Sequence, residues 1–208
     1  MKSYKYLTYI IFLSSIQIVA EDKINEYKIE MLIYEYKETI TTEEFKTLYE
    51  PPFNNHIRFY DDEMNDRSSN FSNISNYINA IIENNLKEAE NLYPSIWFRD
   101  SHDIVKLKDL RDKLKKDKDI NFLKSKSWIQ TIPDLKSDEN LMYMDDKIGF
   151  VTKFYKKRFM HLEMDAFIKN KNNNDINKYI SINQRIFNDG VYLFDHPYFG
   201  VVISINEI

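Results

Sequence analysis

The chain has 208 residues, of which 43% are hydrophobic and 15% aromatic, so it is long enough to bury one sizeable core. Its formal net charge is -4, and the lack of a basic excess argues against a nucleic-acid-binding protein. Cysteine is absent, which excludes disulfide bonds, a thiol nucleophile and a cysteine-based zinc site.

The first 20 residues have the pattern of a secretory signal peptide. Lys2 and Lys5 form a positive n-region, residues 10–19 form an apolar h-region, and Ala20 is small enough for the cleavage position. The apolar run is shorter than the roughly 20 residues of a membrane span, and an uncleaved anchor is the alternative. We expect a mature chain of residues 21–208, a single domain that is secreted or periplasmic, with no membrane span and a net charge of -6 once two lysines are removed.

In the first half of the mature chain the pattern predicts one strand and then helices. Residues 27–36 are rich in β-formers and are expected to form a strand that is partly buried on both faces. Residues 41–49 have the composition of a short helix, and residues 53–72 have that of a long polar loop.

Helical spacing of isoleucine and leucine predicts two longer helices. Apolar residues recur three and four positions apart over 74–93. A second helix is expected over about 102–118, with Asp100 or Ser101 capping its start. Its apolar stripe consists of Ile104, Leu107, Leu110 and Leu114.

In the second half the apolar residues recur every two positions, which predicts antiparallel strands. The candidate strands cover 122–130, 149–169, 179–187, 191–194 and 201–205, with a turn or bulge at 156–158 and a hairpin turn at 188–190. We expect residues 149–205 to pair into one sheet. The predicted fold class is therefore α+β, an antiparallel sheet built mostly from the C-terminal half and packed with helices from about residues 42–118.

Alternation along 158–169 separates the side chains into two sets. The inward set is expected to be Met160, Leu162, Met164, Ala166 and Ile168. His161, Glu163 and Asp165 point the other way, with Phe167 among them. These three side chains, with His196 joining them, are acceptable zinc or manganese ligands, but a solvated strand face shows the same pattern.

The stretch Asp195-His196-Pro197 lies between two apolar, β-prone runs. A turn needs these residues, because Asp favours turn initiation, Pro fixes φ, and Gly200 can take a positive φ. A catalytic reading would make Asp195 orient His196 as a base. Adjacent residues of a strand point to opposite faces, so a direct dyad is unfavourable.

The tail INQRIFNDGVYLFDHPYFGVVISI (182–205) resembles the C-terminal signature of the CsiV family of bacterial peptidoglycan-binding proteins, and its Asp-His-Pro-x-Phe-Gly core matches fully at 195–200. Three further segments resemble family elements in the same order: YKIEMLIYEY (27–36), SWIQ (127–130) and RFMHLEMDAFI (158–168). The chain departs from the family where several arginines are usual, because only Arg185 is present there. Gly190 replaces an acid, and Tyr192 and Ser125 occupy positions that are commonly His.

The resemblance implies a non-enzymatic periplasmic protein without a cofactor or metal, which binds peptidoglycan and supports cell-wall synthesis alongside the synthase machinery. Aromatic rings offer flat surfaces to sugar faces, and arginine can hold the carboxylates of stem peptides. The residues expected at the site are Trp128, Gln130, Arg158, His161, Arg185, Tyr192, Asp195 and His196. Trp128 also fits a core position, and both histidines also fit structural roles.

Two other functions are compatible with the sequence. An envelope adaptor that contacts partner proteins without direct wall binding would show an exposed apolar patch on the sheet. A metal-dependent envelope enzyme would bring His161, Glu163, Asp195 and His196 together in one pocket.

Overall fold

The computed structural model of the chain describes residues 25–39, 41, 49, 56–59, 78–87, 96–133, 139–170 and 176–208. The signal peptide expected over 1–20 lies outside the described residues, as do residues 42–48 of the first expected helix and most of the loop expected over 53–72. No helix in the described part of the chain is long and apolar enough to cross a membrane.

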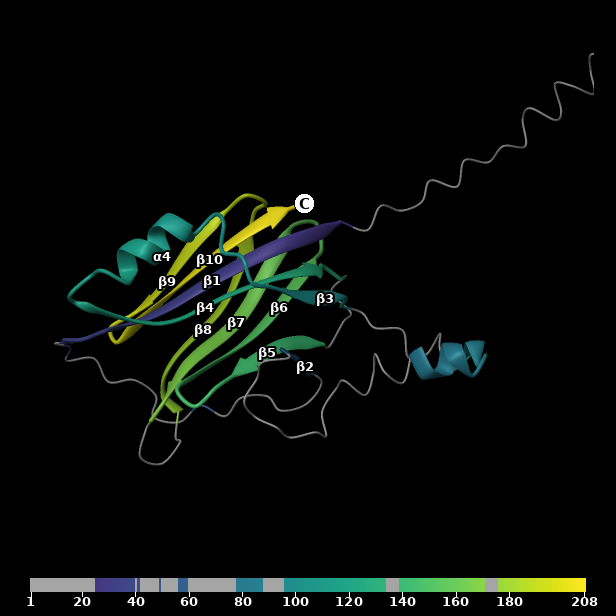
Figure 1. The fold of residues 1–208 in the computed structure, drawn as a ribbon, viewed down its shortest axis with the longest axis horizontal. Coiled ribbons are helices and arrows are strands. Elements are labelled where there is room, and N and C mark those ends of the chain that lie inside the picture. The colour runs from purple at the N-terminus through teal and green to yellow at the C-terminus, as the bar shows by residue number, and fades with distance from the viewer. Residues whose placement is uncertain are drawn as a thin grey trace, which may run out of the picture.

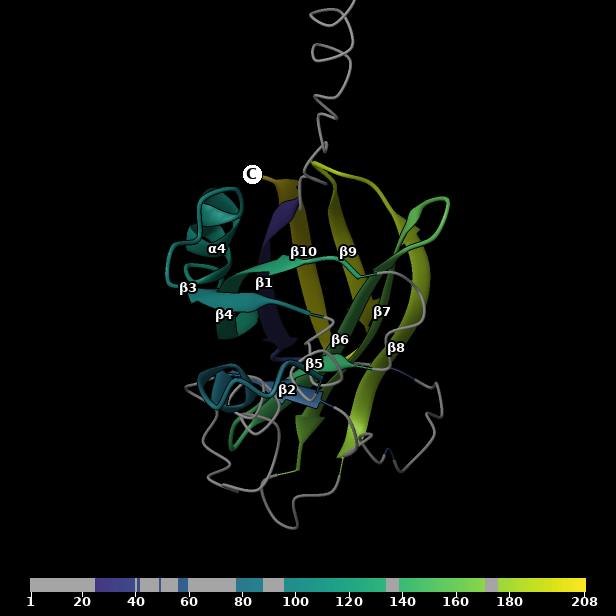
Figure 2. The same ribbon diagram turned by 90° about the vertical axis from the view of Figure 1, so that its right-hand side faces the viewer.

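Two five-stranded sheets face each other across one core (Figure 1, Figure 2). The first sheet contains, in spatial order, β3 (Phe98–Ser101), β4 (Ile120–Thr131), β1 (Glu26–Tyr36), β10 (Phe199–Glu207) and β9 (Val191–His196). The second contains β2 (His56–Arg58), β5 (Asn140–Met144), β6 (Ile148–Lys156), β7 (Met160–Lys169) and β8 (Ile176–Ile186). Neighbouring strands are antiparallel except β2 and β5, which are parallel.

Aromatic side chains fill the centre of the core. The Trp128 ring on β4 is fully buried and stacks on Phe150 of β6, with 6.0 Å between centroids. Phe59 meets both rings edge-on, at 5.3 Å from Trp128 and 5.8 Å from Phe150. Ring contacts of this kind add stabilisation beyond burial of their apolar area, so they join the two sheets.

The predicted alternation of side chains along β7 is confirmed. Leu162, Met164 and Ala166 are buried between the sheets, while His161, Glu163 and Asp165 are partly exposed on the opposite face. Phe167 also lies on that outer face, where it is buried in a separate apolar cluster with Met142, Met144, Val151 and Ile176.

The predicted α+β class is wrong, because the protein is mostly β. Strands hold 59% of the described residues and helices only 11%. Helical spacing predicted two longer helices. In their place, the described part of the chain contains helix α4 (Lys108–Leu114) and the helical residues 78–82 and 86–87.

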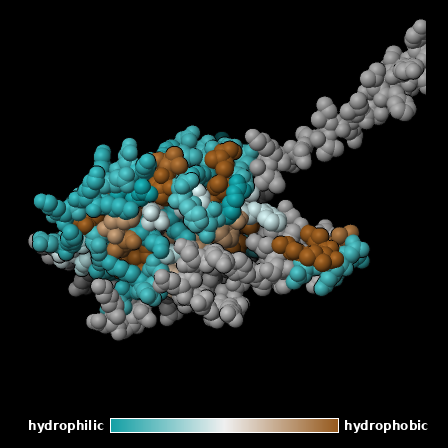
Figure 3. All heavy atoms as spheres, viewed as in Figure 1, coloured by the Kyte–Doolittle hydropathy of each residue, from teal (hydrophilic) through white to brown (hydrophobic). Residues whose placement is uncertain are grey.

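The helical patterns misled because helical spacing does not ensure packing in the core. In the segment of residues 78–87, which is helical only at 78–82 and 86–87, the large apolar side chains are exposed, and Figure 3 shows them as a brown patch. Asp100 and Ser101 belong to β3 instead of capping a helix, and α4 starts only at Lys108. The predicted stripe is real: Ile104, Leu107 and Leu114 are buried on the outer face of the first sheet.

Residues 149–205 do not form one sheet, so that prediction is also wrong. β6, β7 and β8 belong to the second sheet, whereas β9 and β10 belong to the first. The turn at 188–190 therefore crosses from one sheet to the other instead of closing a hairpin. Asp189 takes the positive φ of 59° in this turn, and β9 pairs with β10.

The stretch 195–200 forms a tight corner between β9 and β10, as its turn residues predicted. His196 pairs with Phe199 across the corner, which leaves Pro197 and Tyr198 as the turn. Gly200 does not take a positive φ. It lies within β10, where a Cβ atom would collide with the Tyr34 ring, so its role is to let that ring approach the backbone.

A buried carboxylate fastens the segment before α4 to the first sheet. Glu30 lies on the outer face of β1 and is 1% exposed. Its carboxylate oxygens accept hydrogen bonds from the backbone N–H groups of Val105, Lys106 and Leu107, at 2.9, 3.1 and 2.8 Å. Ser127 and Ser204 flank Glu30 in register on β4 and β10, and their small side chains leave room for this backbone.

We expect Glu30→Ala to lower the free energy of unfolding by about 2–4 kcal/mol, because three backbone N–H groups, of which that of Leu107 is buried, lose a charged acceptor. Urea denaturation followed by circular dichroism measures the change. Glu38→Ala removes an exposed carboxylate from the same part of the chain and should have little effect. Equal destabilisation by the two substitutions would contradict the anchoring role of Glu30.

Charged side chains close the end of the core where β1 finishes. Glu35 pairs with Lys147 at 3.2 Å and with Lys178 at 3.5 Å, which links the two sheets. Asp145 accepts hydrogen bonds from the Lys147 and Ile148 N–H groups and from the Tyr143 hydroxyl. Burial works to raise the pKa of both carboxyls, but these donors and the nearby lysines outweigh it and hold the pKa of Glu35 and Asp145 below ordinary values.

Lowered pKa values stabilise the fold at neutral pH and lose that effect in acid. We expect this contribution to be complete above about pH 4–5 and to fall as pH drops below about 4, where the unfolded carboxyls titrate first. Denaturation series between pH 7 and pH 2.5 measure the loss. Asp145→Asn should make the acid-side slope shallower, and an unchanged slope would refute the assignment.

Candidate ligand-binding surface

Two of the predicted arginines meet at the end of the second sheet where β7 begins. Arg158 and Phe159 lie in the β6–β7 turn, Arg185 lies near the end of β8, and Phe187 follows that strand. The Arg185 guanidinium carbon is 3.3 Å from the Phe159 ring centroid and 4.5 Å from that of Phe187, and Arg158 is 5.3 Å from Phe159. All four side chains are exposed. We call them the arginine–aromatic cluster.

The cluster presents positive charge without an acidic partner. Among the described residues, no carboxylate lies within ion-pair distance of Arg158 or Arg185. A guanidinium held over a ring is oriented by the cation–π contact. Such a group can bind a carboxylate through two parallel hydrogen bonds.

A stacked pair of rings extends the cluster across the sheet. Tyr155, His161 and Arg185 occupy one row, because Tyr155 pairs with His161 and His161 pairs with Arg185. The Tyr155 and His161 rings are 5.1 Å apart at an interplanar angle of 3°. The row joins the arginine–aromatic cluster to the rest of the outer face.

A polar groove of about 490 Å³ lies beside this row on the outer face of the second sheet. It is lined by Asn140, Val151, Lys153, Glu163, Met164, Asp165, Ser181, Ile182 and Asn183. The strand register explains its composition, since Lys153, Glu163 and Asn183 form one row and Val151, Asp165 and Ser181 form the next.

Neutral donors hold the two carboxylates of the polar groove. Glu163 Oε1 accepts hydrogen bonds from the Tyr155 hydroxyl at 3.0 Å and from the Asn183 amide at 3.2 Å. Asp165 Oδ2 accepts one from the Tyr49 hydroxyl at 2.6 Å. Burial and the adjacent carboxylates raise the pKa of both tyrosines, so each phenol stays protonated and remains a donor.

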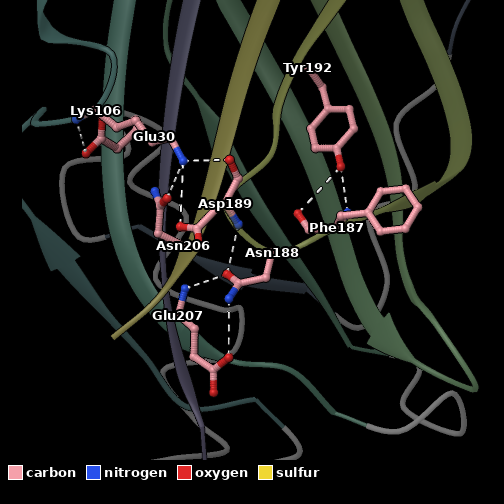
Figure 4. A network of polar contacts seen from close by, with 8 residues as sticks. All are labelled: Glu30, Lys106, Phe187, Asn188, Asp189, Tyr192, Asn206 and Glu207. Atoms are coloured by element: carbon pink, nitrogen blue, oxygen red, sulfur yellow. Dashed lines mark hydrogen bonds and ion pairs between the residues drawn. The ribbon is translucent and has the colours of Figure 1, made fainter.

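The crossover at 188–190 fixes the position of the cluster relative to the first sheet (Figure 4). The Tyr192 hydroxyl accepts a hydrogen bond from the Phe187 N–H at 2.6 Å. Asn188 Oδ1 accepts from the Glu207 N–H at 2.8 Å, and the Lys106 ammonium donates to the Asp189 carbonyl at 2.6 Å. Strands of both sheets therefore hold the segment that carries Phe187.

We expect Tyr192→Phe to lower the free energy of unfolding by about 1 kcal/mol, because the Phe187 N–H loses its acceptor. Chemical denaturation measures the difference. Tyr179→Phe is the control, since no hydrogen bond of its hydroxyl occurs among the described residues. If Tyr192→Phe has no larger effect than the control, the hydroxyl does not hold the crossover.

Two of the predicted site residues lie inside the protein. Trp128 and Gln130 are 0% and 1% exposed, and both belong to β4. The Trp128 indole N–H donates to Gln130 Oε1 at 2.7 Å, so each satisfies a buried polar group of the other. This pair explains the Trp-x-Gln spacing, because residues two apart share one face of a strand.

Asp195 and His196 lie at the opposite end of the core from the arginine–aromatic cluster. Asp195 points outward and accepts a hydrogen bond from the Tyr36 hydroxyl at 2.9 Å. His196 points inward, is 8% exposed, and accepts a hydrogen bond from the Tyr198 N–H at its Nδ1 atom. The structure therefore separates these two residues from each other and from His161.

The metal and enzyme alternatives required these side chains to converge. His161 and Glu163 are on the outer face of the second sheet, whereas Asp195 and His196 belong to the first. The described residues contain no group of three or more His, Asp or Glu side chains placed to hold a metal ion.

Sequence reasoning missed the polar groove, and it missed the role of Phe159 as the ring over which Arg158 and Arg185 meet. The signal for the groove was partly visible, because Glu163 and Asp165 were placed on one strand face. Its other wall depends on which residues of β6 and β8 lie opposite, and strand register is not visible in a single sequence.

The profile of the family described as "Peptidoglycan-binding protein, CsiV" matches residues 3–208, which is almost the entire chain. The chain belongs to the CsiV family. Its membership confirms the resemblance carried by the 195–200 corner, and it places this protein in a family of peptidoglycan-binding proteins.

No curated protein matches this CsiV-family chain. Among solved structures, the cryo-EM structure of the T2SS secretin XcpQ from Pseudomonas aeruginosa matches with a TM-score of 0.31 and 10% identity, over 97% of this chain and 63% of that chain. This CsiV-family chain thus spans less than two thirds of the length of that structure, and a likeness this low carries no argument about its function.

Proposed function

We propose that this CsiV-family protein is a non-enzymatic peptidoglycan-binding protein of the periplasm, which supports cell-wall synthesis alongside the synthase machinery. In this proposal residues 1–20 direct export, and 21–208 are the mature binding domain. The proposal is supported by the family description and by the signal-peptide pattern of the first 20 residues.

The arginine–aromatic cluster is the observation that carries the proposal. Peptidoglycan combines sugar rings with peptide stems that end in carboxylates. Exposed aromatic rings suit the apolar faces of sugars, and unpaired guanidinium groups suit carboxylates. Arg158, Phe159, Arg185 and Phe187 bring both kinds of group to one exposed place.

The site residues divide into two roles under this proposal. Arg158, His161 and Arg185 contact the ligand, and Tyr192 holds the crossover beneath them. The remaining four, Trp128, Gln130, Asp195 and His196, support the scaffold. The chain is acidic overall, so long-range attraction to an anionic wall is absent and affinity must come from these local contacts.

Co-sedimentation with purified sacculi tests the proposal. We expect the wild-type protein to pellet with sacculi and Arg185→Ala to bind about tenfold more weakly, because a bidentate contact is lost. Lys116→Ala is the control, because it also removes one positive charge from an exposed position. Lys116 follows α4, which packs on the first sheet and not on the second, so this variant should pellet like wild type. Absence of the wild-type protein from the pellet would overturn wall binding.

An adaptor function is the second candidate, favoured by exposed apolar side chains on β9. Val191 and Leu193 are 50% and 60% exposed on the outer face of this edge strand. An adaptor would lose partner binding in Leu193→Glu and keep it in Arg185→Ala. A wall-binding protein should instead bind sacculi normally in Leu193→Glu and more weakly in Arg185→Ala.

A further inference from the structure

The polar groove contains two carboxylates that form no ion pair with any described residue. Among the described residues, no lysine, arginine or histidine lies within ion-pair distance of Glu163 or Asp165. Lys153 stands opposite Glu163 in register, but no ion pair joins them. Within the described part of the chain, both carboxylates of the groove are therefore left without an ion-pair partner.

The groove is arranged to receive a donor from outside. The Tyr155 and Asn183 donors bind only Oε1 of Glu163, and Tyr49 binds only Oδ2 of Asp165, so one oxygen of each carboxylate accepts no hydrogen bond from the described residues. Two such oxygens on one strand face, beside a space of about 490 Å³, suit a group that carries several N–H donors and a positive charge.

Positive and negative sites follow each other along the same strands. Arg185 is in register with His161, and Glu163 is two residues further along β7. Two residues of a strand span roughly 7 Å. The outer face thus offers a carboxylate-binding group and an ammonium-binding pair on neighbouring rows of the same strands.

We propose that the polar groove binds the free side-chain ammonium group of the diamino acid in a peptidoglycan stem peptide, through Glu163 and Asp165, while Arg185 binds a carboxylate of the same stem. This inference rests on the proposed function. Cross-linking converts that amine into an amide and removes its charge. The protein therefore distinguishes stems that are not cross-linked through their amine from stems that are.

Calorimetric titration with two soluble stem tripeptides tests the inference. One tripeptide carries the free side-chain amine of its diamino acid, and the other is identical but acetylated at that amine. We expect acetylation to weaken binding about tenfold. The double variant Glu163→Gln, Asp165→Asn should bind both peptides with the affinity that wild type has for the acetylated one. Asp103→Asn, an exposed change before α4, should keep the preference.

The sacculus assay separates the two proposals. If the wild type pellets with sacculi but binds both tripeptides equally, or binds neither, the ammonium site is wrong and wall binding stands. If the preference survives in the double variant, Glu163 and Asp165 are not the site. If the wild type neither pellets nor binds a tripeptide, both proposals fail. Circular dichroism of each variant verifies that it is folded.

Discussion

The packing of two sheets around Trp128 determines which side chains of the facing strands point into the core. Once its indole stacks on Phe150, the face of β4 and the face of β6 that point into the core are both determined. A strand has a period of two, so a shift of one residue would put charged groups into the core. The same constraint that buries Leu162 and Ala166 in β7 therefore sends Glu163 and Asp165 outward. Core and binding surface are two faces of the same strands.

The two ends of this sandwich serve different purposes. The 195–200 corner, which carries the family fingerprint, lies at the end closed by Glu35 and its lysines, where His196 is buried and Gly200 gives space to Tyr34. The exposed cluster around Arg185 lies at the other end, next to the crossover between sheets. The fingerprint therefore reflects geometric requirements of the corner, and it lies away from the candidate ligand-binding surface.

The sequence predicted local features better than long-range ones. The strand at 27–36, the alternation along β7, the turn at 156–158 and the corner at 195–200 follow from side chains that are close in sequence. The division into two sheets depends on which strands pair, and the crossover at 188–190 has the same Asn-Asp-Gly composition as a hairpin. The predicted α+β class failed because Ile and Leu at helical spacing also occur in the exposed segment of residues 78–87, which does not pack in the core. Arg158 and Arg185 were found by chemistry, and their meeting over Phe159 required the register.

The pairing of β1 with β10 has a consequence for how the protein reaches its native state. β1 lies between β4 and β10, and Tyr27 is in register with Glu207. The first sheet therefore stays incomplete until β10 has been made, long after β1, and its apolar residues lack their cover until then. Contacts this distant along the chain slow folding and prolong exposure of unpaired strands to aggregation. Pairing of β10 with β1 is therefore the step that completes the first sheet.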